Sequence, residues 1–478
     1  MGENWVWEGE APAEPQANGS AGASALPTNN LERPMNGGEP RFGSDRLLRY
    51  PTYPTYPTYP TPDGKMTDRE ALYRAILENP DDNTLRLIYA DAIEEDGESR
   101  RAAFIRTQVQ LNHLPEYDPA WVQIRFHDRD KMPGAWVREL PKLPDDLDWP
   151  SEPFLRGFPA NVQAPTSAAF VTHAEDLFSQ FPIEAVELGE AQLSAAQEFA
   201  ASPWISRLVR ISISQGLGAA TARRLFGPTR YERLRELHIG AILTTVETAR
   251  AIVRSRMFRQ LTTLSCRDDR AGGRMLVNEL TQLADPPRLK VLELLGNRLA
   301  PEQVTRLVAA PALSAVEELD LSDNNLRAES LQAIGGAHLP HLRCLHLLRS
   351  HPEEAGIEAL AHSPVLNELR SLSLGGDYLT PASAVVLAAS PRVANLRVLD
   401  MRENRLGDAG AIALANSPHL RNLVHLDLSG NLIEEAGADA LAESPYLTEL
   451  IYLDLHANVI SSVDAARLKR RFEDRVFL

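Results

Sequence analysis

The chain has only two cysteines among its 478 residues, Cys266 and Cys344. So few cysteines exclude a disulfide framework and favour a reducing compartment. No segment approaches the ~18 apolar residues that a membrane-spanning helix needs. Neither Met1 nor Met66 is followed by the basic and apolar stretches of a secretory signal. We therefore expect a soluble, cytoplasmic protein that does not enter a membrane.

The sequence also lacks the common catalytic motifs. No phosphate-cradling GxxxxGK, no HExxH and no GxSxG occurs. We therefore expect a protein that is not an enzyme and that holds no cofactor or metal.

Charge is unevenly distributed along the chain. The net charge of −16 makes nucleic acid an unlikely partner. Residues 206–298 hold 17 Arg/Lys and 8 Asp/Glu, a net charge of +9. Residues 299–466 hold 10 Arg/Lys and 22 Asp/Glu, a net charge of −12. Such a bipolar array could orient a partner electrostatically, or the asymmetry is drift on solvated faces. Binding of nucleic acid through the basic part would require a steep salt dependence.

One pattern, LxxLxLxxNxL, recurs eleven times between Ile183 and the end of the chain, with starts 25 to 28 residues apart. Clear copies include VEELDLSDNNL from Val316 and LVHLDLSGNLI from Leu423. The LxxLxL part alternates with period two and predicts a short strand with inward leucines. The remainder of each copy, such as GDAGAIALANSP from Gly407, predicts a helix that ends at proline.

Strands that alternate with helices predict a parallel sheet covered by helices on one face. Because helices are wider than strands, stacking should bend the array into a horseshoe with the sheet inside. The fold class is therefore α/β, a solenoid of repeats preceded by a small all-α domain. Residues 183–460 resemble ribonuclease-inhibitor-type leucine-rich repeats. Their asparagines should bond neighbouring backbone, and copies with Ser350, Asp377 or Asp269 instead should have looser turns.

The first 65 residues are predicted to be a disordered, Pro-rich segment that includes the tract YPTYPTYPTYPTP. These residues are either a Pro-rich ligand or spacer, or they are not native coding sequence. Translation would start at Met1 in the first case and at Met66 in the second. Residues 66–115 predict three helices: one with a Thr67–Glu70 capping box, one over 81–95 with Leu85, Ile88 and Ala92 on one face, and one over 98–112. The stretch NPDDNTLRLIYADAIEEDGESRRAAFIRTQ closely resembles the bacterial repeat-companion domain, which implies an architecture and no known activity.

The remaining segments are read from their composition. Residues 116–150, polar and rich in proline, are predicted to be a linker. Residues 151–182 are predicted to cap the first repeat, with Phe170, Leu177 and Phe181 on the buried stripe of a helix. Residues 461–478 are predicted to form a C-terminal cap helix.

Strand residues between the leucines should point into the groove of the horseshoe. Asp400, Asp427 and Asp454 should form a ladder of like charges on adjacent strands. The ladder is either an acidic patch for a basic protein partner or a common feature of the repeat. The candidate partner-binding residues are Glu293, Asp320, His346, Asp400, Arg402, His425, Asp427, Tyr452, Asp454 and His456.

The favoured function is a scaffold that binds a protein partner in the groove. One alternative is a regulator of a small GTPase, because such repeats also build the Ran GTPase-activating proteins; this rests on fold analogy alone. The other is a thiol enzyme, since Cys344, His346 and Asp320 should lie close together. The spacing of His338, His341, Cys344 and His346 matches no familiar zinc site.

Overall fold

The computed structural model describes residues 68–127, 134–215, 217–227, 231–240, 245–268 and 272–478. The predictions for residues 1–65, for the Thr67 cap and for Asp269 fall outside these residues. All described residues belong to one compact unit, Tyr56–Leu478. Its main feature is a 13-stranded, all-parallel sheet in which strands follow one another in chain order from β3 to β15.

Each of the eleven pattern copies contributes one strand of this sheet, β4 to β14. Their register is continuous, so that Leu399 of one strand lies beside Leu426 of the next. The strands are β3 (Asn161–Thr166), β4 (Ala185–Glu190), β5 (Arg210–Gln215), β6 (Glu236–Ile239), β7 (Thr263–Cys266), β8 (Val291–Glu293), β9 (Glu318–Asp320), β10 (Cys344–His346), β11 (Ser371–Ser373), β12 (Val398–Asp400), β13 (His425–Asp427), β14 (Tyr452–Asp454) and β15 (Val476–Phe477).

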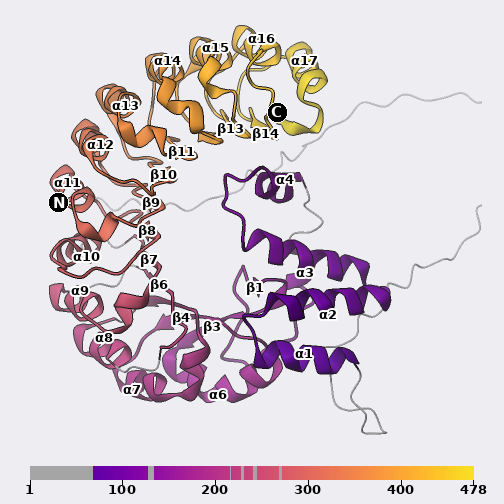
Figure 1. Ribbon diagram of the computed structural model, residues 1–478, viewed down its shortest axis with the longest axis vertical. Helices are drawn as coiled ribbons and strands as arrows, with labels where there is room; N and C mark the ends of the chain where they lie inside the picture. Colours follow the sequence, from indigo (N-terminus) through magenta and orange to yellow (C-terminus); the bar gives the residue numbers. More distant parts are fainter. Residues whose placement is uncertain (1–67, 128–133, 216, 228–230, 241–244, 269–271) are drawn as a thin grey trace, which may run out of the picture. The chain divides into compact units, whose positions relative to one another are not determined.

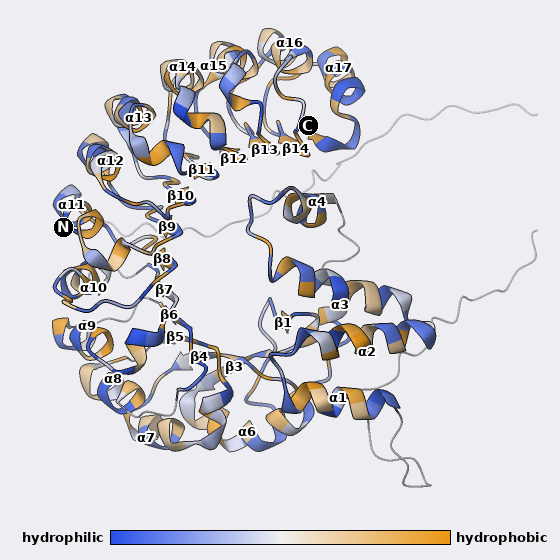
Figure 2. Ribbon diagram, in the orientation of Figure 1, coloured by the Kyte–Doolittle hydropathy of each residue, from blue (hydrophilic) through white to orange (hydrophobic). Residues whose placement is uncertain are grey.

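A helix follows each of the strands β3 to β14, and these helices line the outer side of the arc formed by the repeats (Figure 1). They are α6 (Ser167–Gln180), α7 (Leu193–Ala201), α8 (Ala219–Phe226), α9 (Val246–Val253), α10 (Gly272–Leu280), α11 (Pro301–Val308), α12 (Arg327–Gly336), α13 (Glu353–Ala361), α14 (Pro381–Ala389), α15 (Gly407–Ala415), α16 (Glu435–Glu443) and α17 (Ser462–Phe472). Both hydrophobic and hydrophilic residues appear on the outer helices (Figure 2), as expected for helices buried on one side. The predicted solenoid fold is confirmed.

The leucines of the pattern and the apolar faces of the helices form one continuous core along the array. The asparagine of each clear copy closes the turn after its strand. Asn404, for example, donates through Nδ2 to Leu374 O of the preceding repeat and to Met401 O, both at 2.8 Å. Its Oδ1 accepts from the backbone nitrogens of Asp377 and Leu379. Because each amide bonds the backbone of its neighbour, the asparagines tie consecutive repeats together.

Asp377, which replaces this asparagine in one repeat, keeps the accepting bonds to the preceding repeat but has no amide group to donate within its own turn, so the looser turn stays a prediction. Asp377 Oδ1 accepts from the backbone nitrogens of Ser350 and His351 at 2.6 and 2.7 Å. Its Oδ2 is buried and has no hydrogen-bond partner among the described residues. Burial raises the pKa of Asp377 to about 7.

A second ladder, which sequence analysis missed, runs along the helix side of the repeats. The serine before the proline that ends a repeat helix donates to a carbonyl of the preceding repeat. Ser363, Ser390 and Ser417 donate to Gly335 O, Ala361 O and Ala388 O at 2.5 to 2.7 Å. The following prolines begin short 3-10 helices, which are Pro364–Asn367, Pro391–Asn395 and Pro418–Leu420.

The N-terminal helices form a small core of their own. They are α1 (Asp68–Glu78), α2 (Asn83–Glu95) and α3 (Ser99–Leu111). The face predicted for α2 is wrong, because Ile88 is 45% exposed. The buried residues of α2 are instead Arg86, Tyr89, Ala90 and Ile93. The apolar pattern could not show this, since the buried face includes an arginine with a distant partner.

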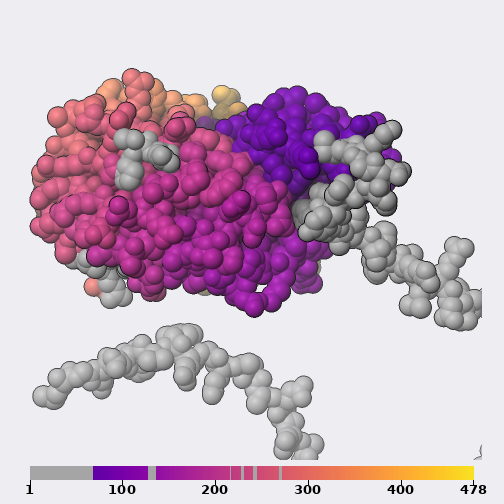
Figure 3. Space-filling view, turned by 90° about the horizontal axis from the view of Figure 1, so that it is seen from below, coloured from indigo at the N-terminus to yellow at the C-terminus, as the bar shows by residue number. Residues whose placement is uncertain are grey.

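That partner is Glu184, next to the first repeat strand. Arg86 is fully buried and its Nη2 lies 2.9 Å from Glu184 Oε1. Arg156 pairs with the same carboxylate, and Arg233 Nη2 lies 3.6 Å from it. The N-terminal helices therefore share a buried ionic centre with the repeats, and the two surfaces lie directly against each other in Figure 3.

A hairpin of β1 (Phe154–Leu155) and β2 (Phe158–Pro159) strengthens this attachment. Phe158 packs among Tyr73 and Tyr89 in the core of the N-terminal helices. The two-residue turn needs positive φ, and Gly157 adopts φ 84°. A Cβ at Gly157 would lie 2.6 Å from Ile105 Cα, so only glycine allows this close approach to α3.

The region 116–150 contains two helices and several buried side chains, which the linker prediction did not include. The helices are α4 (Pro119–His127) and α5 (Gly134–Val137). Trp136 packs with Phe104 of α3 and Phe154 in a separate apolar cluster. At the other end of the chain, Leu468, Phe472 and Val476 are buried against the core. Among the described residues, no helix has the length and apolar character needed to cross a bilayer.

Candidate functional site

Two columns of side chains alternate with the core leucines and face away from the outer helices. The first column precedes the central leucine of each strand, and the second column follows it. In the later repeats, the first column is Glu318, Cys344, Ser371, Val398, His425 and Tyr452. The second column is Glu187, Ser212, His238, Ser265, Glu293, Asp320, His346, Ser373, Asp400, Asp427 and Asp454.

The three aspartates of the predicted ladder are neighbours in register. Each accepts a hydrogen bond from the backbone nitrogen two residues further on, with distances of 3.1 Å for Asp400, 2.9 Å for Asp427 and 2.9 Å for Asp454. Asp320 does the same, at 2.8 Å. The aspartate therefore has a structural role at the end of the strand, where it closes an Asx turn.

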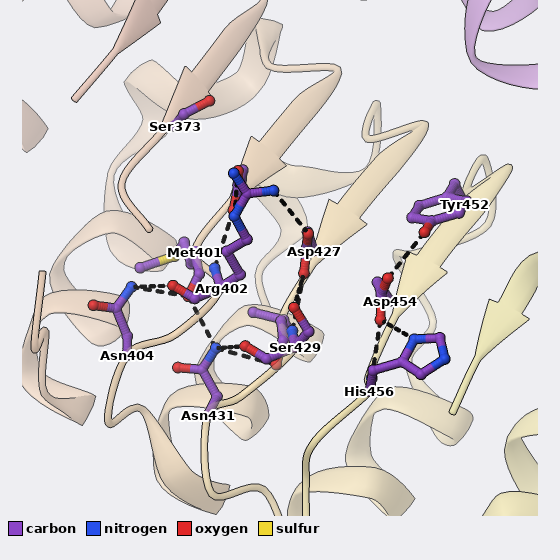
Figure 4. A network of polar contacts seen from close by, with 12 residues as sticks. Ser373, Met401, Arg402, Asn404, Asp427, Ser429, Asn431, Tyr452, Asp454 and His456 are labelled. Atoms are coloured by element: carbon purple, nitrogen blue, oxygen red, sulfur yellow. Dashed lines mark hydrogen bonds and ion pairs between the residues drawn. The ribbon is translucent and has the colours of Figure 1, made fainter. Parts of the chain in front are cut away.

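Arg402 lies between Asp400 and Asp427, two rungs of the ladder, and Figure 4 shows it directed toward Asp427. Its Nε is 3.6 Å from Asp400 Oδ2, and its Nη1 is 3.9 Å from Asp427 Oδ2. Both aspartates are only 8% exposed. Burial raises the pKa of Asp400 to about 6 despite Arg402, and burial also raises the pKa of Asp427. The ladder is therefore less available as an open acidic patch than its sequence indicates.

The carboxylate of Asp454, the third rung of the ladder, is bonded by two residues of its own repeat. Asp454 Oδ2 accepts from the Tyr452 hydroxyl at 2.9 Å, and Asp454 Oδ1 lies 2.7 Å from His456 Nδ1. The His456 side chain is 54% exposed and the Arg402 side chain 41%. These two side chains are the most accessible of the candidate residues in the last repeats.

The remaining candidates in the second column lie in the middle of the array. Glu293 is bound by Arg267, whose Nη2 is 2.7 Å from Glu293 Oε2. Although burial opposes it, hydrogen bonds from Ser265 and Arg267 hold the pKa of Glu293 below its ordinary value. His346 Nδ1 lies 3.1 Å from Ser373 Oγ, and its Nε2 lies between Glu318 and a residue far from the repeats in sequence, Glu116.

Residues 114–127, hereafter the α4 segment, lie across the first column from β10 to β14. At the β10 end, Glu116 Oε1 is 3.6 Å from His346 Nε2. Glu116 also hydrogen-bonds the thiol of Cys344, which is 4% exposed. Burial raises the pKa of Tyr117, whose charged neighbours Arg343, Arg370 and Glu317 directly precede β10, β11 and β9. The polar end of the segment is thus held by β9 and β10.

At the β13 and β14 end the contact is aromatic. The ring of Phe126 lies 4.1 Å from that of Tyr452 and 4.9 Å from that of His425, centroid to centroid. Val122 is fully buried and packs with Val424 and Tyr452. Trp121, Ile451 and Phe477 complete this cluster. Two candidate residues, His425 and Tyr452, are therefore covered by the chain itself.

His425 is half-buried beside this cluster, and its buried Nε2 atom has no hydrogen-bond partner among the described residues. Burial lowers the pKa of His425 to about 4. At neutral pH the imidazole is therefore uncharged, which suits its contact with the Phe126 and Tyr452 rings.

Sequence analysis missed the α4 segment because its composition is polar overall. A local signal was present, however. Asp118 and Pro119 are typical of a helix start, and Asp118 Oδ1 accepts from the Ala120 nitrogen at 2.8 Å. Trp121, Val122 and Phe126 then give an apolar face at helical spacing.

The geometry disfavours a thiol nucleophile at Cys344. Burial raises the pKa of this thiol well above its ordinary value, and nearby Glu116 and Glu318 raise it further. The thiolate is the reactive form of cysteine, and here it would lie beside carboxylates. Among the described residues, the carboxylates Glu435, Asp439 and Asp464 lie close enough together to hold a metal, but Arg467 already pairs with Asp439.

Three stretches of the chain, residues 314–335, 394–415 and 419–442, match the family model described as Leucine Rich repeat. These stretches are leucine-rich repeats. Such repeats generally serve as protein-interaction scaffolds, and those scaffolds are typically not catalytic. No curated protein matches the chain.

Two solved structures resemble this chain at low identity. An internalin from Listeria monocytogenes is 16% identical over 60% of this chain and 78% of its own length, with a TM-score of 0.37. The structure of the yeast Rad7 and Elc1 complex matches at 14% identity over 83% of this chain and 95% of that chain, with a TM-score of 0.38.

Proposed function

We propose that this protein is a non-enzymatic scaffold that binds a protein partner on the concave face of its leucine-rich repeats. The observation that carries this proposal is the α4 segment. A helix from outside the repeats is held on this face by a polar contact at β10 and an aromatic contact at β14. The face therefore has the chemistry to hold a protein helix.

The second column supplies accessible polar groups beside this helix. Arg402 and His456 are half exposed, and Arg267 is also 50% exposed beside Glu293. Polar groups at the rim of a contact fix its register and give selectivity. Three groups of candidate carboxylates hold this row in place: Glu293 pairs with Arg267, Asp400 and Asp427 approach Arg402, and Asp454 bonds His456. Asp320 closes an Asx turn, and His346 lies near Glu116 of the α4 segment.

The N-terminal helices, in this proposal, are a repeat-companion domain that holds the first repeat in place through the Arg86–Glu184 pair. A cytoplasmic location accords with two cysteines that are both buried and outside any disulfide.

Site-specific photo-crosslinking tests the scaffold function. A photoreactive phenylalanine would replace Arg402 or His456 in the full chain, and Ile412 on the outer helix α15, 38% exposed, is the matched control. We expect one protein of defined mass to be captured from native lysate at both concave positions and not at Ile412. Equal capture at all three positions, or capture at Ile412 alone, would contradict binding on the concave face.

A further inference from the structure

We propose that the α4 segment is a built-in ligand of the concave face, and that the partner presents a helix of the same kind and displaces it. Such a helix is short, carries an aromatic side chain near its end and follows an acidic residue. This inference rests on the proposed scaffold function and names the class of partner. The argument comes from how the α4 segment is held.

The cluster beneath α4 is separate from the core of the repeats. Val122, Val424 and Tyr452 form their own apolar group, whereas the leucines of the repeats form a continuous core without them. Removal of α4 would therefore uncover a surface and leave the solenoid core intact. This is the behaviour expected of a docked ligand, since each repeat is stabilised mainly by its neighbours.

The segment spans the first column from β10 to β14. Glu116 contacts β10 and Phe126 contacts β13 and β14, a distance of roughly 19 Å at ~4.8 Å per strand. Between these ends, Ser371 and Val398 of the first column are also buried. The column from Cys344 to Tyr452 therefore offers a seat for one helix.

The fit of the built-in ligand is incomplete at both ends. Glu116 and Glu318 place two carboxylates on one imidazole, with Oε1 atoms 3.6 and 3.7 Å from His346 Nε2. At the other end, His425 Nε2 is buried without a partner in the described part of the chain. A partner helix that places no second carboxylate beside His346, or that forms a hydrogen bond with His425 Nε2, would bind the seat better than α4 does.

A partner helix must compete with the α4 segment, which is covalently attached to the protein that carries its binding site. A segment attached to its own binding site acts at an effective concentration that reaches the millimolar range. A free helix therefore binds with an apparent affinity reduced by the fraction of molecules whose seat is open. Loss of the anchor residues of α4 should raise the affinity for a helix added in trans.

The experiment uses the full chain and a fluorescent peptide of residues 113–127, HLPEYDPAWVQIRFH. We expect the chain with V122A and F126A to bind the peptide at least roughly tenfold more tightly than the unchanged chain, measured by fluorescence anisotropy. A further Y452A substitution should abolish this gain. A peptide with V122A and F126A is the matched control and should not bind.

Cys344 gives a second measurement, because the α4 segment covers it. We expect a thiol reagent to label Cys344 slowly in the unchanged chain, faster in the V122A/F126A chain, and slowly again once the peptide is added. Cys266, which is fully buried in the core, is the internal control for unfolding. If Cys266 becomes reactive as well, the single variant F126A replaces the double variant.

Equal peptide affinity in the two chains, or peptide binding that leaves Cys344 unprotected, would overturn the built-in ligand. That result would not remove the scaffold function, because crosslinking at Arg402 and His456 detects a partner on the concave face independently. Conversely, a peptide that binds the open seat when no protein is captured would uphold the seat and contradict the scaffold.

Discussion

The ring of Phe126 lies 4.1 Å from the ring of Tyr452, centroid to centroid, although one belongs to the N-terminal region and the other to the last repeat. Tyr452 also contacts His425 and Phe477 and donates its hydroxyl to Asp454. It therefore connects the α4 segment, the acidic ladder and the C-terminal strand β15. The aromatic contact of Tyr452 and its hydrogen bond can be separated by substitution.

We expect Tyr452→Ala to release α4, because it removes the ring that Phe126 and Val122 contact. Loss of this ring should cost about 2–4 kcal/mol in unfolding free energy. Hydrogen exchange should show protection of the α4 amides falling by roughly tenfold or more, while the amides of α12 and α13 change little.

Tyr452→Phe is the matched control for this prediction. It keeps the ring and removes only the hydrogen bond to Asp454, which contributes about 1 kcal/mol. Protection of α4 should stay near that of the unchanged chain. If both substitutions release α4 equally, the hydroxyl, and not the aromatic contact, holds the segment.

The sequence was sufficient to predict the repeats because their signals are local and recur. An inward leucine and a turn asparagine follow from the same pattern in every copy, and the structure uses Asn404 as that pattern predicts. The serine ladder recurs at the same period, but a single Ser–Pro pair is also typical of an ordinary helix stop. Its bond to the preceding repeat, such as that from Ser417 to Ala388, becomes evident only once the repeats are stacked.

The candidate site was less predictable because its contacts join distant parts of the chain. The alternation of residues placed Asp400 and Asp427 on the concave face correctly, but their burial depends on neighbours such as Arg402. The seat for α4 is made by β10 to β14, so nothing near residue 120 in the sequence identifies it. The buried Arg86 is similar, because its partner Glu184 lies beside the first repeat.

Substitutions of the acidic and basic members of the buried ionic centre around Glu184 should destabilise the protein to different extents. Glu184 is the carboxylate that Arg86, Arg156 and Arg233 approach together. Glu184→Gln would leave buried guanidinium charge without its counter-charge and should destabilise the protein by about 3–5 kcal/mol. Arg86→Met should cost less, roughly 0–2 kcal/mol, because Arg156 and Arg233 still pair with Glu184 and an apolar chain can lie against Phe158.

Urea unfolding at pH 7 measures both variants. Burial already lowers the pKa of Arg86 to about 10, and its Nε and Nη1 have no hydrogen-bond partner among the described residues. Arg86 is therefore costly to bury even in the unchanged protein. An Arg86→Met variant as unstable as Glu184→Gln would show that the Arg86 pair alone, and not the shared centre, holds the N-terminal helices.

Asp377 should make stability depend on pH. The unfolded carboxyl titrates near 4, whereas burial raises the folded pKa of Asp377 to about 7. Between these values the folded protein binds more protons than the unfolded one, so unfolding free energy falls as pH rises from about 4 through about 7. We expect Asp377→Asn to remove this loss and to stabilise the protein above pH 7 by on the order of 2–4 kcal/mol.

The asparagines at this position in other repeats explain why Asp377→Asn should stabilise the protein, and one of them, Asn404, provides the control substitution. The new amide would keep an oxygen for the Ser350 and His351 nitrogens and add a donor where Oδ2 now has no partner in the described part of the chain. Asn404→Asp makes the reverse change and loses the donor bonds to Leu374 and Met401. The loss of unfolding free energy should be largest above pH 7, where the new buried carboxyl is ionised. Thermal unfolding of both variants from pH 4 to pH 8 provides the measurement. Parallel curves for Asp377→Asn and the unchanged chain would mean that Asp377 is already ionised in the fold.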